Sequence, residues 1–491
     1  MKKIVVIGAG VGGLSAAIQL KRAGYEVEII EKNNEVGGRL NKFEKNGFTF
    51  DTGPTLLLMP WVLKEFFKKV NRKIEDYLEL VEIEPIYDVY LGNKNNKITI
   101  SRKIEVLKKS MKKISEEDEK NLTKYLIAGK DYYENAKKHF LQKNVHKIQD
   151  IINLDSLKAL IKIGFSQTYF EHVKKYFKND LIKAAFSFQS IYVGASPTKI
   201  PAAYSLIQYV EITEGVWCPK GGMNKIREAL EKIAKEENIN IKKNTEAKKI
   251  IVKNNKCEGA LLSNGEIITS DIILSNVDLP FTYNKLLEPN ISPTQKRKLE
   301  YSCSAIVIIL GIKRKLNIRH HTFILPENFL KSLEELFTTK IIPEDPGIYI
   351  NCPSKTFPKT APKNKESIYI LIPVPNNQSK IDWKKEYKTF RKKIFEKIKK
   401  VLEIDLEEII EFEKPILPED WEKNYSLLYG STFGLAPTLF QSAFFRPQNR
   451  DPKIKNLYFV GASTHPGSGI PIVLFSANNI VERIIEENPL R

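Results

Sequence analysis

Residues 3–39 read KIVVIGAGVGGLSAAIQLKRAGYEVEIIEKNNEVGGR, and this stretch decides the fold. The β-branched run at its start is typical of a strand buried inside a parallel sheet. A helical pattern of apolar residues follows and stops at Gly24, a natural residue for a helix C-terminus. A second apolar run, 26–30, ends just before Glu31. The order strand, helix, strand predicts a βαβ unit and therefore an α/β fold.

The glycines Gly8, Gly10 and Gly13 lie between the first strand and the helix, with the spacing GxGxxG. The first permits a tight turn, the second lets the backbone approach a pyrophosphate, and the third lets helix and strand pack closely. The helix N-terminus then offers free N–H groups to the phosphates. Glu31 can accept hydrogen bonds from ribose hydroxyls. The pattern predicts a bound dinucleotide but does not separate FAD from NAD, and a glycine-rich turn without a ligand is the alternative.

Length and composition set further bounds. A chain of 491 residues is too long for one ordinary core, so two domains are expected. No window holds about eighteen consecutive apolar residues, so no membrane-spanning helix is expected. The N-terminus resembles a signal peptide, but its glycines would break the apolar helix, so we expect a cytoplasmic protein. The four cysteines form no CxxC pair, which indicates neither a metal site nor a disulfide framework.

The formal net charge of +19 has two interpretations. Lysine, isoleucine and asparagine are abundant together, as in chains from AT-rich genomes, and this composition alone can explain much of the excess. The other interpretation is attraction to a polyanion. No nucleic-acid-binding motif is present, so no nucleic-acid partner is expected. An anionic membrane surface is the better candidate.

Two further stretches carry a resemblance to a known family. EKNNEVGGRLNKFEKNGFTFDTGPTLL (31–57) places GGR and later GP after the second strand, and NLYFVGASTHPGSGIPIVLFSANNI (456–480) repeats the strand–glycine–helix elbow at the far end. Together they resemble the flavoprotein group that includes amine oxidases, protoporphyrinogen oxidases and carotenoid desaturases. In that group GGR lies along the FAD pyrophosphate, GP approaches the isoalloxazine ring, and the C-terminal elbow closes the ring end of the site. The resemblance therefore implies FAD.

A narrower resemblance covers essentially the full chain. The stretches 217–223 (WCPKGGM) and 429–451 (YGSTFGLAPTLFQSAFFRPQNRD) resemble the bacterial-type phytoene desaturase family, and 300–312 and 347–375 are similar to its 4,4′-diapophytoene desaturases. The resemblance implies an FAD-binding Rossmann-like domain interleaved with an α+β substrate domain. It also implies an FAD-dependent oxidoreductase acting on CH–CH bonds, with an apolar polyene as substrate and an electron acceptor such as a quinone or oxygen.

Several alternatives on this fold stay open: a forty-carbon phytoene desaturase, a carotenoid cis–trans isomerase, or a terminal oxidase of diapocarotenoids. Rab GDP-dissociation inhibitors also resemble the fold and act as prenyl-binding carriers without flavin redox chemistry. The complete set of Gly8, Gly10, Gly13, Glu31 and GGR argues against such a carrier.

The resemblance also implies which residues hold FAD, bound without a covalent link because the STHPG stretch lacks a cysteine. Amine oxidases carry an acidic residue where this chain has Ala462, and carotenoid desaturases share that loss. The expected FAD-binding residues are Gly8, Ala9, Gly10, Gly12, Gly13, Glu31, Lys32, Gly38, Arg39, Gly53, Pro54, Thr55, Ala247, Gly461, Ala462, Ile470 and Pro471.

A wholly apolar substrate must be oriented by the shape of a tunnel, and aromatic faces can stabilise allyl-cation character. Three aromatic residues near the C-terminal elbow are candidates to line it, although ordinary core packing is the alternative: Phe440, Phe444 and Phe445. Three nearby polar residues can assist proton loss or serve a structural role: Gln441, Arg446 and His465. The sequence assigns no catalytic base.

We expect a discontinuous FAD domain formed by residues 1–101, 215–290 and 425–491. The segments 102–214 and 291–424 are expected to form the substrate domain. Peripheral association with a membrane is expected, through aromatic and lysine-rich helices within 102–190 or, as second choice, a basic amphipathic helix at 380–400. The apolar face of that second helix can alternatively cover a sheet of the substrate domain.

Overall fold

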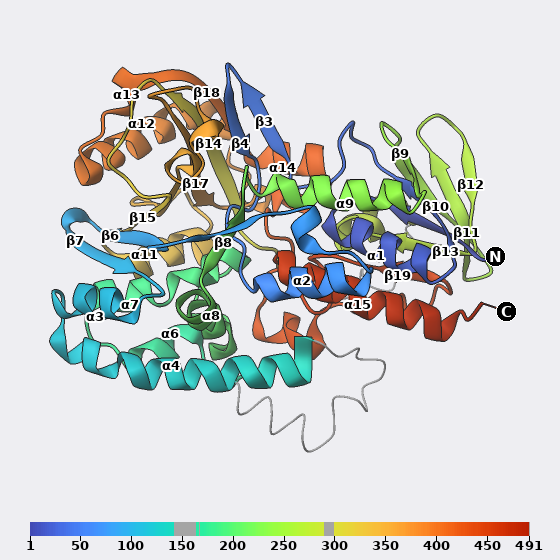
Figure 1. Ribbon diagram of the computed structural model, residues 1–491, viewed down its shortest axis with the longest axis horizontal. Coiled ribbons are helices and arrows are strands. Elements are labelled where there is room, and N and C mark those ends of the chain that lie inside the picture. The colour runs from blue at the N-terminus through green and yellow to red at the C-terminus, as the bar shows by residue number, and fades with distance from the viewer. Residues whose placement is uncertain (142–163, 166, 289–298, 491) are drawn as a thin grey trace.

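The computed structural model describes every residue except 142–163, 166, 289–298 and 491. Two large β-sheets organise the chain. In Figure 1 the five-stranded sheet and its helices occupy the right-hand side, where both termini lie, and the seven-stranded sheet occupies the left-hand side.

The five-stranded sheet is entirely parallel and has the order β19-β13-β1-β2-β9. It takes strands from the beginning, the middle and the end of the chain: Ile4 pairs with Ile272, and Ile273 pairs with Leu457. Its strands are β1 (Lys3–Ile7), β2 (Glu26–Ile30), β9 (Asn240–Lys242), β13 (Ile272–Ser275) and β19 (Leu457–Phe459). The predicted α/β fold is confirmed, and the C-terminal elbow lies in the same sheet as the N-terminal one.

Alternate residues of the central strand β1 face different layers. Ile4 and Val6 pack against helices, whereas Val5 and Ile7 pack against a three-stranded antiparallel sheet. The helices are α1 (Val11–Arg22), α2 (Pro60–Lys69), α9 (Asn224–Glu236) and α15 (Ile470–Glu487). The small sheet is β10 (Ala247–Lys253), β11 (Lys256–Leu262) and β12 (Ile267–Thr269). Both faces of the parallel sheet are therefore covered, as its continuous apolar strands require.

The seven-stranded sheet is mixed, with the order β18-β14-β17-β16-β15-β6-β7. Its strands are β6 (Tyr87–Leu91), β7 (Asn93–Ile100), β14 (Ser304–Ile312), β15 (His321–Leu325), β16 (Ile348–Asn351), β17 (Glu366–Val374) and β18 (Ile410–Ile416).

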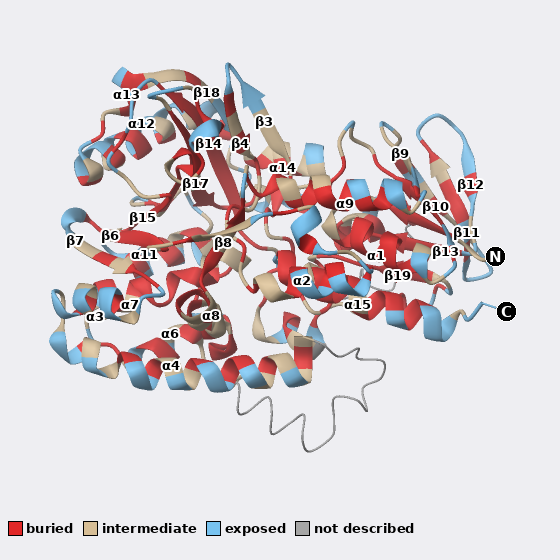
Figure 2. Cartoon of the chain, viewed as in Figure 1, coloured by how far each residue is buried: buried red, intermediate tan, exposed pale blue. Residues whose placement is uncertain are grey.

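Residues of β14 alternate between two apolar cores. Ile306 and Ile308 face α12 (Trp383–Leu402), whose buried side includes Trp383 and Phe390. The opposite core receives side chains from helices on the other face: α3 (Ile104–Lys112), α4 (Glu116–Ala136), α6 (Tyr169–Lys174), α7 (Asp180–Ala185) and α8 (Leu206–Glu214). Figure 2 shows α3 and α4 with buried residues toward the sheet and exposed residues on their outer sides. The predicted helix at 380–400 is confirmed, and its apolar face covers the sheet.

One predicted boundary is wrong. Residues 87–101 were expected in the first domain, but β6 and β7 lie in the seven-stranded sheet, where Thr322 pairs with Asp88. The reason is packing, because Val89 is buried in the core that also contains Phe323. The local sequence of a strand does not specify which sheet it joins, and the division into two domains otherwise stays a prediction.

The remaining elements connect these layers. They are β3 (Lys42–Lys45), β4 (Phe48–Asp51), β5 (Leu80–Ile83), β8 (Val216–Pro219), α10 (Leu279–Phe281), α11 (Phe329–Glu334), α13 (Leu406–Ile409) and α14 (Pro418–Tyr425). Within the described ranges, no helix has both the length and the apolar character needed to cross a membrane.

Candidate active site

A cavity of about 570 Å³ is lined both by the two glycine elbows and by side chains of the seven-stranded sheet. Fifteen of the predicted FAD-binding residues lie along it. They are Gly8, Gly10, Gly12, Glu31, Lys32, Gly38, Arg39, Gly53, Pro54, Thr55, Ala247, Gly461, Ala462, Ile470 and Pro471. The other two, Ala9 and Gly13, are not among the residues that line it.

Two long helices begin at this cavity. The residue before α1 is Gly10 and the residue before α15 is Gly469, and neither helix has a side-chain N-cap. The first turn of each helix contributes residues to the lining, among them Val11 and Ile470. Both N-termini therefore present uncapped N–H groups and a positive helix end, which suit an anionic ligand.

The side chain of Asn276, directly after β13, lies between the two elbows. Its Nδ2 donates to the Val460 carbonyl at 2.9 Å. An added Cβ would lie 2.9 Å from Nδ2 at Gly12, 2.8 Å from Nδ2 at Gly461, and 2.6 Å from Oδ1 at Gly10. A methyl group at any of these three glycines would therefore force the Asn276 amide to move.

The two predicted residues that do not line the cavity, Ala9 and Gly13, have structural roles next to it. A Cβ on Gly13 would lie 2.2 Å from the carbonyl oxygen of Gly8, so this glycine serves the close packing of helix on strand. The Ala9 N–H donates to Glu31 Oε2 at 2.8 Å.

Glu31 is buried and makes local contacts with both oxygens. Oε1 accepts from the Asn33 backbone at 2.9 Å and from its side chain at 3.0 Å, while Oε2 accepts from Ala9. The carboxylate is thus held in place directly after β2, where it lines the cavity and can accept further hydrogen bonds.

A buried charged cluster lines the cavity beside the GGR stretch. Arg39 Nη1 donates to the Thr432 carbonyl at 2.6 Å, and burial lowers the pKa of its guanidinium. Burial raises the pKa of Asp278 to about 6, while hydrogen bonding to Ser463 and the nearby charges of Arg39 and Arg446 oppose the rise. The cluster holds fixed positive groups next to a carboxyl that ionises near neutral pH.

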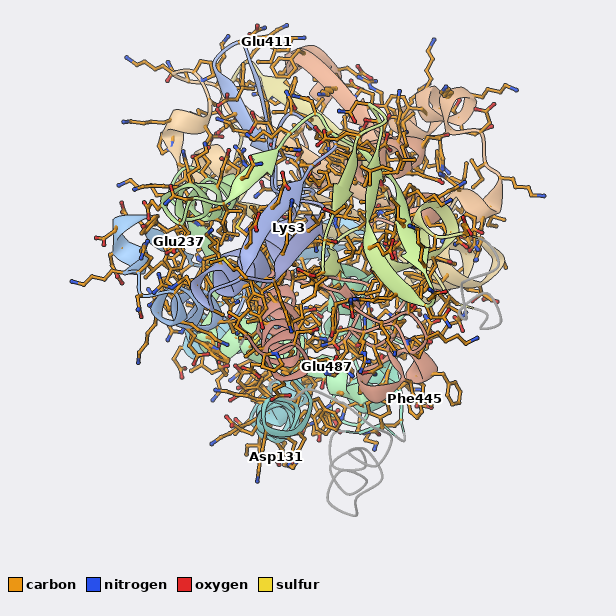
Figure 3. The ribbon with its side chains drawn as sticks, turned by 90° about the vertical axis from the view of Figure 1, so that its right-hand side faces the viewer. Lys3, Asp131, Glu237, Glu411, Phe445 and Glu487 are labelled. Atoms are coloured by element: carbon orange, nitrogen blue, oxygen red, sulfur yellow. The ribbon has the colours of Figure 1, made fainter. Side chains whose placement is uncertain are left out.

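The three phenylalanines expected to line the tunnel do not have that role where the structure describes them. Phe440 is 69% exposed and Phe445 is 45% exposed, and neither lines the cavity. Figure 3 shows Phe445 at the edge of the molecule. The side chain of Phe444 lies outside the described atoms. The two short 3₁₀ turns here direct Ser442 and Ala443 toward the cavity instead, so the expectation is corrected.

The three polar candidates divide into two groups. Arg446 and His465 line the cavity, whereas Gln441 does not. Gln441 binds the backbone of Glu300 with both amide atoms, which is a structural role. Arg446 is buried and donates to backbone carbonyls, including that of Ala462 at 2.5 Å, so it fixes the C-terminal elbow.

The far part of the cavity is apolar and lies on the seven-stranded sheet. Residues of three neighbouring strands form its floor, and those of β15 and β17 alternate, as the period of a β-strand requires. They are Tyr369, Leu371 and Pro373 of β17, Ile348 and Tyr349 of β16 with Gly347 just before it, and Phe323 and Leu325 of β15.

One hydrogen-bonded chain joins the two parts of the cavity. The hydroxyls of Thr55 and Tyr349 lie 2.6 Å apart, and the Tyr349 hydroxyl lies 2.8 Å from Nδ1 of His321. Burial lowers the pKa of His321 well below its usual value, so its ring is neutral at neutral pH. These two hydrogen bonds connect Thr55, directly after the GP stretch, to the uncharged imidazole of His321 through Tyr349.

Asn276, Asp278, Tyr349 and His321 are site residues that sequence reasoning missed. A signal existed for the first two, because polar residues directly after a buried parallel strand lie at the edge where α/β folds bind ligands. Tyr349 and His321 had no such signal in the sequence, because only the pairing of β15 with β16 brings them together.

The residues present fit FAD. Uncapped helix N-termini, a glycine cradle without room for side chains, and the Arg39 guanidinium match a pyrophosphate, and Glu31 matches a ribose. None of the four cysteines, all buried, is among the residues that line the cavity. In the described parts of the chain, no group of three or more His, Cys, Asp or Glu side chains is placed to hold a metal ion.

Comparison with known proteins agrees with this geometry. Residues 11–485 match the family model described as flavin containing amine oxidoreductase. The chain is 37% identical to a 4,4′-diapophytoene desaturase (4,4′-diaponeurosporene-forming) of Staphylococcus aureus strain Newman, over 99% of both chains. It is 35% identical to a zeta-carotene-forming phytoene desaturase of Myxococcus xanthus, over 99% of this chain and 94% of the relative.

A solved structure supports the fold itself. An oxidoreductase from Methanosarcina mazei superimposes with a TM-score of 0.64 at 17% identity, covering 98% of this chain and 100% of that one. The protein therefore belongs to the flavin containing amine oxidoreductase family, among its carotenoid desaturases, as an FAD-dependent oxidoreductase.

Proposed function

We propose that the chain desaturates a linear, apolar polyene, and that its substrate is 4,4′-diapophytoene, converted to 4,4′-diaponeurosporene. The observation that carries the proposal is the continuity of one cavity from the glycine elbows to an apolar floor of sheet side chains. The Staphylococcus aureus relative, which is named for this conversion, supports the choice of substrate.

The protein's own residues supply position and shape for this reaction. When bound, FAD supplies a hydride acceptor. The residues proposed to hold it are the fifteen predicted ones that line the cavity, with Arg39 and the helix N-termini on the pyrophosphate and Glu31 on the ribose. The apolar floor orients the polyene by shape, because a hydrocarbon offers no hydrogen bond. The neutral His321 holds the Tyr349 hydroxyl by a hydrogen bond and so fixes this ring on the floor of the cavity.

Co-expression with a dehydrosqualene synthase tests the reaction. We expect a yellow, conjugated product whose mass is lower than that of 4,4′-diapophytoene by two hydrogens for each new double bond. The control is Gly10→Val, since a Cβ at this position would lie 2.6 Å from Asn276 Oδ1 and would block the elbow. A product of unchanged mass would indicate an isomerase, and added oxygen would indicate a terminal oxidase.

Forty-carbon phytoene is the second candidate substrate, because the Myxococcus xanthus relative is named for it at a similar identity. Purified protein in liposomes, supplied with each hydrocarbon separately, distinguishes the two. Turnover of 4,4′-diapophytoene should be faster. Faster turnover of phytoene would assign the chain to the forty-carbon reaction.

We propose that FAD is bound without a covalent link and is reoxidised by a quinone or oxygen. Acid precipitation should release all yellow colour into the supernatant, whereas colour in the pellet would contradict the proposal. Turnover under argon with an added quinone, compared with turnover in air, identifies the acceptor. A colourless purified protein that binds polyenes would instead favour a carrier.

We also propose peripheral association with an anionic membrane. The net charge of +19 supports it, and so do two exposed apolar side chains, Ile127 on α4 and Phe445. Both belong to segments that reach the cavity, through Ala136 and Ala443. The helix α12 is a weaker candidate, because its apolar face is buried against the sheet.

Flotation with anionic liposomes at low and high salt tests this association. Ile127→Glu and Phe445→Glu should each reduce the bound fraction. Ile267→Glu is a matched control, since Ile267 on β12 is exposed to the same 58% as Ile127 but belongs to the sheet behind the FAD elbows. Binding at neither salt concentration would contradict the proposal.

A further inference from the structure

The apolar part of the cavity stops at one strand of the seven-stranded sheet. Among the described residues of that sheet, those lining the cavity belong to β15, β16 and β17 or directly precede β16. The next strand, β6, is hydrogen-bonded to β15, with Val89 beside Phe323. Val89 is fully buried, yet it does not line the cavity. Something therefore closes the cavity between β15 and β6.

Three rings close it, and we name them the aromatic wall: Phe188, Tyr192 and Phe323, all of which line the cavity. The Phe323 ring centroid lies 4.6 Å from that of Phe188 and 6.1 Å from that of Tyr192. On its other side Phe323 stacks on Tyr349 at 4.7 Å, and the Tyr349 hydroxyl reaches Thr55. The aromatic wall therefore lies one ring beyond Tyr349, whose hydroxyl bonds Thr55 directly after the GP stretch.

A buried polar network supports the aromatic wall from behind. The Tyr87 hydroxyl donates to Glu211 Oε2 at 2.6 Å, and Gln189 Nε2 donates to the Tyr87 hydroxyl at 3.0 Å and also to Gln208. All four side chains are fully buried, and the Tyr87 ring contacts Phe323 at 5.0 Å between centroids.

This network makes the wall difficult to displace. Moving Phe323 or Phe188 outward would press on Tyr87 and separate hydrogen-bonded groups that have no access to water. Buried polar groups that lose their partners carry a large penalty, so the hydrogen bonds that Tyr87 makes to Glu211 and Gln189 oppose such a movement, although Glu211 Oε1 and Gln208 Nε2 have no hydrogen-bond partner of their own. A substrate too long for the cavity therefore cannot create room by pushing these rings aside.

We infer that the aromatic wall sets the longest polyene that the cavity accepts, and that it excludes the forty-carbon chain in favour of the thirty-carbon one. This inference rests on the proposed function. A hydrocarbon has no polar group to recognise, and each extra buried methylene favours the longer chain in an open tunnel. Preference for the shorter chain therefore requires a steric stop.

A substitution at Gly347 tests the inference by making the cavity shorter, whereas substitutions in the aromatic wall make it longer. It lines the floor just before β16, two residues from Tyr349, so the strand alternation places a side chain at this position on the cavity face. An added Cβ would meet only Pro326 Cδ, at 3.7 Å, which is ordinary contact. A large side chain at 347 should shorten the cavity without straining the backbone.

The experiment measures loading rather than turnover. FAD-bound protein is equilibrated under argon, without an electron acceptor, with liposomes that contain equal amounts of 4,4′-diapophytoene and phytoene. The protein is then re-isolated and its bound hydrocarbons are quantified by chromatography. We expect the wild type to load the thirty-carbon chain about tenfold or more in excess, comparable with the discrimination that one misfit methylene can give.

Opening the wall should reduce this ratio. Phe323→Ala and Phe188→Leu should each lower it to about threefold or less, and Gly347→Phe should reduce loading of both chains. The control is Phe412→Leu on β18, a buried ring in the same core that does not line the cavity, and it should leave the ratio unchanged. The flavin spectrum and melting temperature of each variant show whether it is folded.

An unchanged ratio in a folded Phe323→Ala or Phe188→Leu protein would overturn the inference, as would a wild type that loads more phytoene. If Phe323→Ala does not fold, the milder Phe188→Leu provides the test. Failure of the proposed function has a different signature: hydrocarbons load with the expected ratio, but adding an acceptor produces no desaturated product.

Discussion

The glycine elbows and the aromatic wall lie on the same cavity but are built in different ways. At the elbows the groups that face the cavity belong to the backbone. Glycines keep side chains away, so that backbone N–H groups and helix N-termini can approach a ligand. At the wall the working groups are side chains, and their bulk closes the space. The first region recognises charge and the second recognises length.

The two regions also differ in where their residues come from. Each elbow is a contiguous stretch of strand, glycine turn and helix, and the Asn276 side chain lies between them. The wall combines the 3₁₀ segment Phe188–Val193 with β15, and its supporting network adds residues of β6 and α8. A local change should therefore break an elbow outright, whereas changes at the wall should alter specificity or pH dependence.

Replacing Gly13 with Ala should have the largest effect. The new Cβ would lie 2.2 Å from a backbone oxygen that cannot move, so we expect a loss of about 5 kcal/mol or more in the free energy of unfolding and little yellow protein. Urea unfolding and flavin absorbance provide the measurements. Gly265→Ala is the control, because its φ is +86° but its surroundings are open, and it should cost about 1–2 kcal/mol. Similar losses in both variants would contradict the packing argument.

The second prediction concerns the network behind the wall. Burial raises the pKa of Glu211 to about 8, against the opposing hydrogen bond from Tyr87, so the folded protein holds this proton more tightly than the unfolded chain does. Stability from this group is then present at low pH and is lost as the pH rises from about 4.5 through about 8. The loss amounts to about 4 kcal/mol.

Glu211→Gln should remove this loss. We expect its free energy of unfolding, measured in urea from pH 5 to pH 8.5, to fall about 4 kcal/mol less than that of the wild type. Glu117→Gln on the exposed side of α4 is the control and should follow the wild-type curve. Parallel curves for wild type and Glu211→Gln would show that Glu211 is ionised in the folded protein.

Glu31→Ala should weaken FAD binding by about 2–3 kcal/mol, since one charged acceptor is lost while the other contacts remain. Its removal also leaves the N–H groups of Ala9 and Asn33 without their carboxylate partner. The dissociation constant, measured by flavin fluorescence during titration of the FAD-free protein, should rise about 100-fold. Glu26→Ala, at the exposed start of β2, should leave it unchanged. An unaltered constant in Glu31→Ala would remove this residue from the site.

The smallest effect is expected for Asn276→Ala. The Val460 carbonyl loses a donor, and the two elbows lose the amide that separates them, at a cost of about 1–2 kcal/mol in the free energy of unfolding. Because the two elbows then lose their fixed spacing, the FAD dissociation rate should rise as well. Asn240→Ala, which removes a contact to Glu28 on the edge of the same sheet, is the control for stability alone. Equal dissociation rates in both variants would contradict a role for Asn276 in positioning the elbows.

The sequence by itself determined the βαβ opening, the C-terminal elbow, the FAD family and most of the residues that line the FAD part of the cavity. These features can be predicted from the sequence because each one is local. A strand, a glycine turn and a helix follow one another within about thirty residues, and steric rules tie the glycine positions to the turn. The amphipathic helix α12 was predicted for the same reason, since its apolar spacing is contained in one segment.

Only the tertiary structure decided the shape of the polyene part of the cavity. Phe440 and Phe445 were predicted to line it because they are near the elbow in sequence, but they are exposed, and residues from β15, β16 and β17 take that role. Strand pairing places Phe323 beside Tyr349, and helix packing places Phe188 on Phe323. The second contact joins residues more than 100 positions apart in the chain, and an apolar side chain has no directional bonding that would reveal its partner in the sequence.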